Sequence, residues 1–416
     1  MERTIEQLAD AVKAASTVLY ACPTTKKNAA LRAVVRRLRT AVPDILTANA
    51  ADLDSARAAG ISGVLLDRLM LDEKRIVQMI QGVRDVIALP DPVGVVTERR
   101  RRPNGLGIAR VRVPLGAVGI IYEARPNVTV DAAALCLKAG NAVLLRGGSE
   151  AIRTNGVLVR VLRASLEDAG LPPDAVGFID RTDRDAVYEM LKQVRSLDVI
   201  IPRGSQQLIR LIQERSSVPV IAHGEGNCHV YVDGSADLGM AEEIVFNAKT
   251  QRPSVCNAAE KLLVHQRVAG RFLPRIIARL RSAGVEVRGD EATRSIVSDV
   301  VPAQESDWTT EYLDLIIGVR VVPDLDAAIA HINTCGSHHS DAIVTRAAGH
   351  AERFLREVDS AAVYVNASTR FTDGYEFGLG AEIGISTQKL HARGPMGLVE
   401  LTSTKFQVRG KGQVRS

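Results

Sequence analysis

The stretch Val118-Gly119-Ile120-Ile121-Tyr122-Glu123-Ala124-Arg125-Pro126-Asn127 joins a short apolar run to a polar turn, and a segment with helical periodicity follows at Asp131–Ala139. The same order of apolar run, small or charged turn and periodic segment recurs through the rest of the chain. An alternation of this kind predicts strands and helices that form parallel sheets with helices on both faces. The fold class is therefore expected to be α/β.

The expected strands fall into two series, and the break between the series lies near His223–Asn227. The first series is Val118–Tyr122, Ala142–Leu145, Val176–Ile179, Val199–Ile201 and Val218–Ala222. The second series is Val230–Val232, Leu262–Val264, Val285–Val287, Ile316–Val322, Ala342–Val344 and Val363–Val365. Two parallel-sheet domains are expected from this division, after a helical N-terminal block that runs from Thr4 to about Ile87.

Between the helical block and the first strand series lies an arginine-rich segment. Arg99–Arg102 precede Pro103-Asn104-Gly105, and apolar and basic residues alternate after this turn, which is a strong signal for a β-hairpin. Four consecutive arginines could contact nucleic-acid phosphates. No aromatic residue is interleaved with them and no helix-turn-helix, RRM or KH pattern follows, so a solvated hairpin or a subunit contact is favoured. The chain also ends in a basic stretch, Lys405 to Arg415.

Composition excludes several classes of protein. The 416 residues are 46% hydrophobic and 24% charged with a net charge of +5, which excludes disorder, collagen and a disulfide scaffold and suggests two or three domains. Five irregularly spaced cysteines favour reduced thiols in a cytosolic setting. The polar N-terminus has no signal-peptide pattern and no run of about eighteen apolar residues occurs, so a soluble, intracellular protein without membrane contact is expected.

Two of the loops after expected strands combine an arginine with glycine. Leu145 leads into Arg146-Gly147-Gly148-Ser149, and Ile201 leads through Pro202 into Arg203-Gly204-Ser205. Glycine lets backbone N–H groups approach an anion, and the helix that follows adds a positive dipole end. The alternative is that any α/β fold needs glycine turns. No G-x-G-x-x-G pattern with a downstream acid is present, so a standard Rossmann dinucleotide fingerprint is not supported.

Cys256 differs from the other cysteines because it stands in a polar turn, Thr250-Gln251-Arg252-Pro253-Ser254-Val255-Cys256-Asn257. A thiol there would be exposed enough to react, and Arg252 or a helix N-terminus could lower its pKa. Residue chemistry alone leaves a structural thiol as the alternative. No C-x-x-C or H-x-x-x-H spacing occurs, so no metal site is expected.

The Cys256 segment resembles the nucleophile segment of the gamma-glutamyl phosphate reductases, a family within the aldehyde dehydrogenase superfamily. Other stretches resemble the same family in order along nearly the whole chain. They are Pro114–Gly116, Glu123–Thr129, Leu145–Gly148, His223–His229, Asn366–Phe371 and Gly378–Thr387. The resemblance implies an aldehyde dehydrogenase-like fold with two parallel-sheet domains and a β-hairpin oligomerisation arm.

The resemblance also implies an activity, the NADPH-dependent reduction of L-glutamate 5-phosphate to L-glutamate 5-semialdehyde and phosphate in proline biosynthesis. A thioester on Cys256 would be the intermediate. Aldehyde-oxidising relatives use a glutamate to activate water, and Glu225 stands slightly out of that register, which favours phosphate as the acyl partner. Two alternatives stay open: an NAD-dependent hydrolytic aldehyde dehydrogenase, and a non-enzymatic polyanion-binding protein with an inactive version of the fold.

Site residues follow from the same resemblance. The side-chain amide of Asn127 and the backbone N–H of Cys256 would hold the oxyanion. Arg125 and Arg252 would bind the substrate's anionic groups, with salt-bridged surface arginines as the alternative. Glu311 resembles the glutamate that contacts the nicotinamide ribose, although an ordinary surface acid is also possible. The residues expected to border the cofactor are Arg146, Gly147, Gly148, Ser149, Gly204, Ser205 and Glu311.

Ser149 departs from the family pattern, in which a lysine often stands at this position. A serine would tolerate a 2′-phosphate, which is consistent with NADP and leaves NAD possible.

The expected organisation has three parts. Residues 1–98, 113–225 and 366–385 would form an NADP-binding domain, residues 226–365 a catalytic domain, and residues 99–112 and 386–416 the oligomerisation arm. A homo-oligomer is expected, with an upstream glutamate 5-kinase as a possible partner and no nucleic acid.

Overall fold

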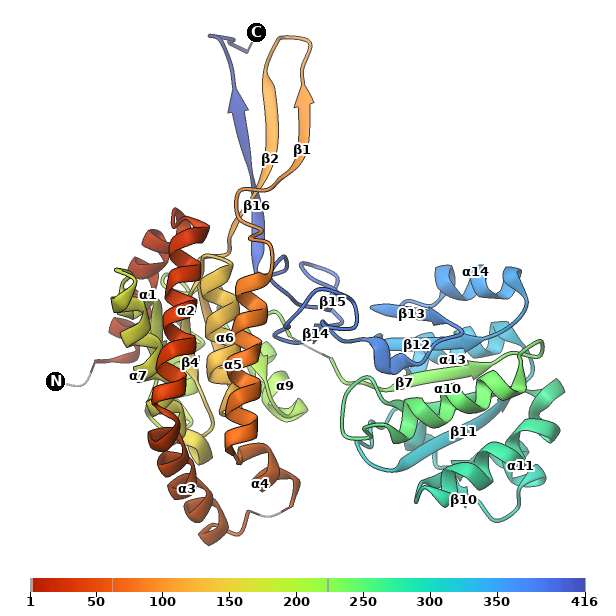
Figure 1. Cartoon of the computed structure of the whole chain (residues 1–416). Coiled ribbons are helices and arrows are strands. Elements are labelled where there is room, and N and C mark those ends of the chain that lie inside the picture. Colours follow the sequence, from red (N-terminus) through yellow and green to blue (C-terminus); the bar gives the residue numbers. More distant parts are fainter. Residues whose placement is uncertain (1–2, 62, 223, 416) are drawn as a thin grey trace. The chain divides into compact units, whose positions relative to one another are not determined.

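Two parallel sheets and one three-stranded antiparallel sheet carry almost all the strands of the chain. The computed structural model describes residues 3–61, 63–222 and 224–415 (Figure 1). Unit 1 comprises Met1–Ala222, Leu379–Gly384 and Met396–Ser416, and unit 2 comprises His223–Gly378 and Ile385–Pro395. The segment 366–385, expected in one domain, is divided between the units, and residues 386–395, expected in the arm, belong to unit 2.

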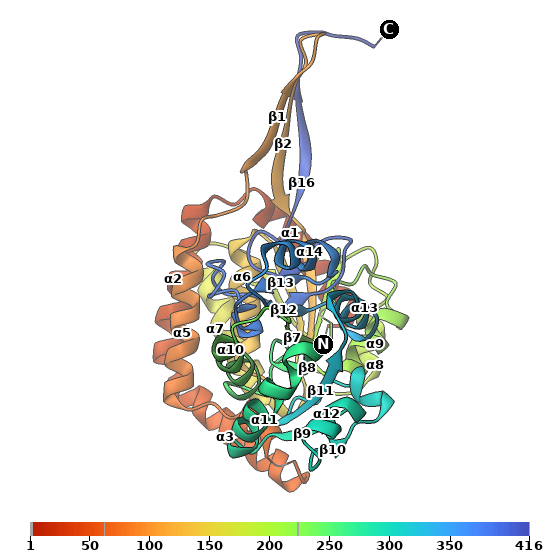
Figure 2. The same ribbon diagram turned by 90° about the vertical axis from the view of Figure 1, so that its right-hand side faces the viewer.

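Unit 1 begins with the expected helical block. Its helices are α1 (Ile5–Tyr20), α2 (Thr24–Thr40), α3 (Val42–Ala58), α4 (Val64–Leu69) and α5 (Glu73–Ala88). The first helix starts at a capping box, in which Thr4 Oγ1 accepts from the backbone of Gln7 and the Gln7 side chain accepts from the backbone N–H of Thr4. The helices α2 and α5 pack against each other, and both lie at the left in Figure 2.

A four-stranded parallel sheet with the order β5-β4-β3-β6 forms the centre of unit 1. Its strands are β3 (Ala117–Tyr122), β4 (Ala142–Arg146), β5 (Val176–Phe178) and β6 (Val199–Arg203). The connecting helices are α6 (Asn127–Lys138), α7 (Ile152–Asp168), α8 (Asp185–Met190) and α9 (Gln206–Arg215). Every residue of β3 is buried. The strand order reverses between β3 and β6, and the loops at the carboxyl ends of strands next to such a point are where ligands bind in open α/β sheets.

The strand expected at Val218–Ala222 is wrong. This segment makes only an isolated bridge between Val220 and Ile200. Ile200 donates to the carbonyl of Pro219, and Ile221 donates to the carbonyl of Ile200. Pro219 has no N–H to donate, so a longer ladder does not form at this edge.

The arginine-rich hairpin is confirmed. Strands β1 (Val96–Arg101) and β2 (Gly107–Pro114) pair antiparallel, and Gly105 at the turn has a φ of 89°. Sequence periodicity missed a third strand, β16 (Thr402–Arg409), which pairs with β2 along eight residues. Phe406 and Val408 on β16 are 67% and 57% exposed, although the guanidinium of Arg110 lies over the Phe406 ring, 5.9 Å from its centroid.

Unit 2 contains a seven-stranded parallel sheet with the order β10-β9-β11-β8-β7-β12-β13. The strands are β7 (Cys228–Val232), β8 (Ala259–His265), β9 (Glu286–Gly289), β10 (Val301–Pro302), β11 (Ile316–Val322), β12 (Ser340–Val344) and β13 (Ala362–Val365). The helices are α10 (Leu238–Thr250), α11 (Gln266–Ser282), α12 (Glu291–Ile296), α13 (Leu325–Cys335) and α14 (Ala348–Glu357). Two separate clusters of buried apolar residues pack against this sheet, so its strands are buried on both sides.

Four short 3₁₀ helices and one two-stranded ribbon complete the chain. They are η1 (Ser149–Ala151), η2 (Pro173–Ala175), η3 (Glu305–Trp308), η4 (Thr369–Phe371), and the pair β14 (Ile385–Ser386) and β15 (Gly394–Pro395). Within residues 3–61, 63–222 and 224–415, no helix has the length and apolar character needed to span a lipid bilayer.

Candidate active site

Cys256 lies in unit 2, in the loop between α10 and β8, and it is partly exposed. The loop turns tightly, because the N–H of Ala258 donates to the carbonyl of Val255. Gly226 presses against this turn: a Cβ atom at Gly226 would lie 1.7 Å from the carbonyl oxygen of Cys256. Only glycine at position 226 therefore allows the backbone before β7 to pack this closely against the backbone of Cys256.

A second cysteine holds the same loop. The Sγ of Cys228 donates to the carbonyl oxygen of Cys256 at 3.1 Å. Burial raises the pKa of the Cys228 thiol well above its usual range, which keeps the thiol protonated and able to donate. Cys228 is therefore built as a support for the loop and is a poor nucleophile, because only the thiolate is reactive.

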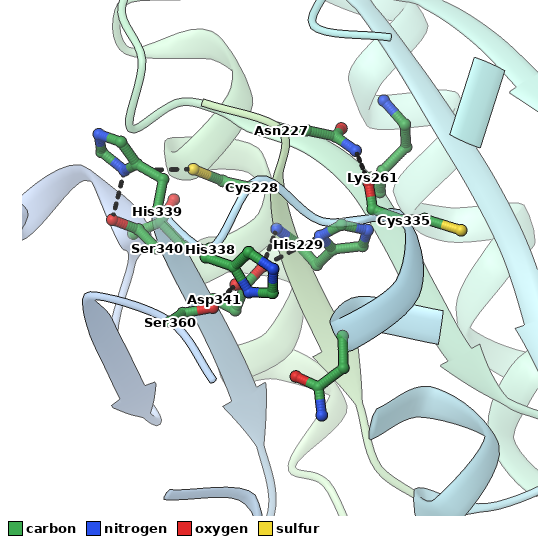
Figure 3. Close-up of polar contacts among 12 residues, drawn as sticks. Asn227, Cys228, His229, Lys261, Cys335, His338, His339, Ser340, Asp341 and Ser360 are labelled. Carbon is green, nitrogen blue, oxygen red and sulfur yellow. Dashed lines mark hydrogen bonds and ion pairs between the residues drawn. The ribbon is translucent and has the colours of Figure 1, made fainter. Parts of the chain in front are cut away.

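Buried polar side chains lie next to Cys228, whose Sγ is 3.7 Å from the Nδ1 of His339 (Figure 3). The Nδ1 of His339 lies 2.8 Å from Ser340 Oγ, which lies 2.6 Å from Thr372 Oγ1. The backbone N–H and the Nδ1 of His229 both lie within 3.0 Å of one carboxylate oxygen of Asp341. Burial lowers the pKa of His339 to about 4, so its ring is neutral at pH 7.

The helix η4 is hydrogen-bonded to Asn257, the residue after Cys256. Thr369 Oγ1 donates to the carbonyl of Asn257 at 2.7 Å, and Asn257 Nδ2 donates to the carbonyl of Thr372 at 2.8 Å. Arg370 lies between them, and its Nε donates to Gln251 Oε1 at 2.8 Å. This arginine was not among the expected site residues, although it stands in a stretch that resembled the family.

Glu311 projects from the loop before β11 and accepts a hydrogen bond from the N–H of Gly226 at 2.8 Å. Burial raises the pKa of its carboxyl group to about 7. The structure thus links Glu311 directly to the glycine that supports Cys256.

Buried charged side chains fix the loop that carries Glu311. Lys261 Nζ donates to the carbonyl of Thr310 at 2.7 Å. The carboxylate of Glu260 accepts from the N–H groups of Tyr312 and Leu313 at 3.3 Å and pairs with Lys249 at 3.1 Å. Lys249, Glu260 and Lys261 are all fully buried, which is tolerated because each has a partner.

Asn127 lies in unit 1, at the first position of α6. Its Nδ2 donates to Asp131 Oδ2 at 2.9 Å, one turn along the same helix. Burial raises the pKa of Asp131 to about 6. The side-chain amide has two N–H groups, so it can hold Asp131 with one and donate to an oxyanion with the other.

The loop after β4 contains Arg146, Gly147, Gly148 and Ser149, with Ser149 starting η1. Arg146 donates to the carbonyls of Thr182 and Asp183 at 3.2 and 3.3 Å, and its buried Nε has no partner among the described residues. A Cβ atom at Gly147 would lie 2.2 Å from the Nδ2 of Asn155, which is also buried and unpartnered there. Unused donors beside a glycine pair are a feature of a site for an oxygen-rich ligand.

The loop after β6 contains Gly204 and Ser205, and Ser205 caps α9. The N–H of Ser205 donates to a carboxylate oxygen of Glu123 at 2.6 Å, and a Cβ atom at Gly204 would lie 2.5 Å from that carboxylate. The carboxylate of Glu123 thus occupies the place at a helix N-terminus where a phosphate group is stabilised. The residues at the carboxyl ends of β4 and β6 therefore fit a dinucleotide phosphate.

The expected site residues divide between the two units. Arg125, Asn127 and the loops after β4 and β6 belong to unit 1, and Arg252, Cys256 and Glu311 belong to unit 2. Arg125 is half-buried and Arg252 is exposed. His223, part of one family-like stretch, lies outside the described residues. Within the described residues, no group of three or more His, Cys, Asp or Glu side chains could hold a metal ion.

Comparisons with known proteins agree over the whole chain. The aldehyde dehydrogenase family model matches residues 2–315. The gamma-glutamyl phosphate reductase of Carboxydothermus hydrogenoformans is 59% identical over 98% of each chain, and that of Moorella thermoacetica is 58% identical over 96% of each chain.

Solved structures extend the agreement to the fold. The crystal structure of gamma-glutamyl phosphate reductase from Thermotoga maritima is 52% identical, covers 100% of both chains and has a TM-score of 0.98. An acetylating aldehyde dehydrogenase from Geobacillus thermoglucosidasius shares the fold at 16% identity, with a TM-score of 0.69 over 99% of this chain and 97% of its own. The α/β fold with two parallel sheets and a small antiparallel sheet is confirmed.

Proposed function

The chain belongs to the aldehyde dehydrogenase family and, within it, to the gamma-glutamyl phosphate reductases, and from this premise we propose that it reduces L-glutamate 5-phosphate to L-glutamate 5-semialdehyde and phosphate with NADPH. The reaction is an oxidoreductase step of proline biosynthesis. The single observation that carries the mechanism is the half-exposed thiol of Cys256 in a loop that Gly226, Cys228 and Asn257 hold in place.

Cys256 acts as the nucleophile. Its thiolate attacks the acyl carbon of L-glutamate 5-phosphate, the bond from that carbon to the phosphate oxygen breaks, and phosphate leaves with the electron pair. When bound, NADPH supplies the hydride that reduces the thioester carbon. The resulting thiohemiacetal then loses its carbon–sulfur bond, which releases the aldehyde and restores the Cys256 thiolate.

Asn127 and the backbone N–H of Cys256 stabilise the oxyanion that forms in both addition steps. The hydrogen bond to Asp131 fixes the rotamer of Asn127, so the second N–H of its amide is already oriented when the oxyanion forms. Donors that are fixed in advance are the kind that lower the free energy of a tetrahedral transition state.

Cofactor binding is assigned to two groups of residues. Arg146, Gly147, Gly148 and Ser149 would hold the adenosine half of NADPH, and Gly204 and Ser205 would hold its pyrophosphate at the N-terminus of α9, where the Glu123 carboxylate lies in this structure. Glu311 would accept a hydrogen bond from the nicotinamide ribose. The unused donors of Arg146 and Asn155 support this assignment.

Arg125 and Arg252 bind the anionic groups of the substrate. The glutamyl chain carries a carboxylate at one end and the acyl phosphate at the other, and guanidinium groups match both in geometry and charge.

The sheet formed by β1, β2 and β16 acts as an oligomerisation arm. Its exposed Phe406 and Val408 support this assignment, because apolar residues on a thin sheet gain stability when a second subunit covers them. A Phe406→Asp variant should shift the protein to a smaller species in sedimentation, and an unchanged distribution would contradict the assignment.

A glutamate 5-kinase supplies the substrate, and the five free thiols fit a reducing, cytoplasmic setting.

One assay tests this function. The protein is incubated with pyrroline-5-carboxylate, the cyclised form of the semialdehyde, and NADP⁺, with and without phosphate, while NADPH is followed by absorbance. Multiple turnovers only when phosphate is present would support the acyl-phosphate reaction. Turnover that ignores phosphate would instead identify a hydrolytic aldehyde dehydrogenase, and salt-sensitive RNA binding without turnover would identify a polyanion-binding protein.

A further inference from the structure

We propose that Arg370 and Arg252 together form the subsite for the phosphoryl group of the acyl phosphate, and that Gln251 is the positioning residue that orients Arg370. The proposal rests on the proposed function and adds to it a phosphate-binding residue, a partner for Arg252 and the identity of the group bound.

The backbone of Arg370 is fixed beside the nucleophile. Its carbonyl accepts from Asn257 Nδ2 at 3.3 Å, and the preceding Thr369 donates to the Asn257 carbonyl at 2.7 Å. Because Asn257 directly follows Cys256, these bonds hold Arg370 in register with the reactive sulfur. All of these residues belong to unit 2.

One hydrogen bond, to Gln251, orients the guanidinium of Arg370. Its Nε donates to Gln251 Oε1 at 2.8 Å, and the two terminal nitrogens make no ion pair with a described carboxylate. A guanidinium held by Nε alone presents its remaining N–H groups as a fork, the geometry that binds phosphate oxygens in pairs.

Like charge gathers around Arg370. Burial, together with the positive charge of Arg252, lowers the pKa of the half-buried Arg370. The carboxylate of Asp373 adds negative charge to this region, and its Oδ1 accepts from the N–H of Tyr375 at 2.9 Å, but it makes no ion pair with Arg370 or Arg252 among the described residues. Two neighbouring cations without a carboxylate bridge are stabilised when an anion binds between them.

The position of this pair identifies the anion. Arg370 is hydrogen-bonded to Asn257, the residue after Cys256, and to Gln251 in the same loop, so it lies beside the loop that carries the sulfur. The phosphoryl group is attached to the carbon that Cys256 attacks, whereas the substrate's α-carboxylate lies at the far end of the glutamyl chain. The anion nearest to the sulfur during the attack is therefore the phosphoryl group, and the cations beside the sulfur are matched to it.

The test uses the reverse reaction of the full-length enzyme, in which phosphate is a substrate. NADPH formation from pyrroline-5-carboxylate and NADP⁺ is measured at varied phosphate for wild type, Arg370→Gln, Arg370→Lys and Gln251→Leu. Arg271→Gln, an exposed arginine on α11, is the matched control. The fast formation of NADPH before phosphate is added reports whether each variant is folded and acylated.

Arg370→Gln should raise KM for phosphate about tenfold or more, the effect of losing one charge-assisted hydrogen bond, with KM for the aldehyde changed less than about twofold. Arg370→Lys should recover part of the loss, and Gln251→Leu should raise KM for phosphate several-fold. An unchanged KM for phosphate, or a raised KM for the aldehyde instead, would overturn the proposal. A wild-type enzyme that ignores phosphate would overturn the proposed function itself.

Discussion

The loop after β6 in unit 1 and the loop around Cys256 in unit 2 both contain positively charged groups, but the positive charge is compensated differently in each. In unit 1, the N–H of Ser205, the N-cap residue of α9, donates to the carboxylate of Glu123. In unit 2, Arg370 is held through an uncharged amide, Gln251, and its terminal nitrogens make no ion pair with a described carboxylate.

The difference indicates what each loop is built to bind. A carboxylate at a helix N-terminus stabilises the empty site and must move when a phosphate arrives, which weakens binding but allows release. Arginines that are oriented by a neutral amide keep their charge for a ligand. We infer that unit 1 is suited to a cofactor that is exchanged at each turnover, and unit 2 to an anion that takes part in the chemistry.

The largest expected effect comes from removal of the sulfur. Cys256→Ala should lower kcat by about 10⁴-fold or more, since the covalent route is lost, while NADPH binding measured by fluorescence stays close to wild type. Cys22→Ala, which removes a thiol in unit 1, is the control and should keep full activity. Retained turnover in Cys256→Ala would disprove the assignment of the nucleophile.

Asn127→Ala should have the next largest effect. Loss of one oxyanion donor should lower kcat by about 10²–10³-fold with little change in KM, because the donor acts in the transition state. Asp131→Asn keeps an acceptor for the Asn127 amide and should lose much less. Equal losses of kcat in the two variants would mean that Asn127 stabilises α6 through Asp131 and does not stabilise the oxyanion.

Glu311→Gln should change the pH dependence of stability. The pKa of Glu311 is raised to about 7 in the folded protein by burial, above its unfolded value of 4.5, so the folded state binds the extra proton between these values. Wild-type stability should therefore fall as pH rises from about 4.5 to 7, by up to ~3 kcal/mol from this group.

The glutamine variant lacks this ionisation. Its free energy of unfolding should therefore increase relative to that of wild type between pH 5 and pH 8 in urea titrations. A constant difference across that range would show that Glu311 is ionised throughout.

Glu123→Gln should give the smallest effect and bears most directly on the difference between the two loops. Without the negative charge at α9, NADPH should bind a few-fold more tightly, because a helix N-terminus favours an anion by ~0.3–1 kcal/mol. Weaker NADPH binding in a fluorescence titration would mean that Glu123 contacts the cofactor instead of competing with it.

Much of this architecture is readable from local patterns. Buried runs such as Val118–Tyr122 and the Asn104-Gly105 turn predict their strands because short-range sterics decide them. The strand expected near Val220 failed because Pro219 removes a donor at the sheet edge. β16 was missed because its pairing with β2 joins residues almost three hundred positions apart.

The site was less readable for the same reason. Cys256 and Asn127 stand in stretches with a family resemblance, but the roles of Arg370 and Cys228 depend on contacts with distant residues. Thr369 reaches Asn257 across 112 positions, and no local pattern records such a contact. In the sequence, Glu123 is only part of the polar turn after Tyr122, and the fold brings it to Ser205.

Mass spectrometry of the acylated enzyme tests most directly whether Cys256 forms a thioester that phosphate cleaves. Wild-type protein is mixed with pyrroline-5-carboxylate and NADP⁺ without phosphate, quenched in acid and digested. We expect a γ-glutamyl group on the peptide that contains Cys256, and its rapid loss when phosphate is added before the quench. No adduct on Cys256, or an adduct that water removes as fast as phosphate does, would contradict it.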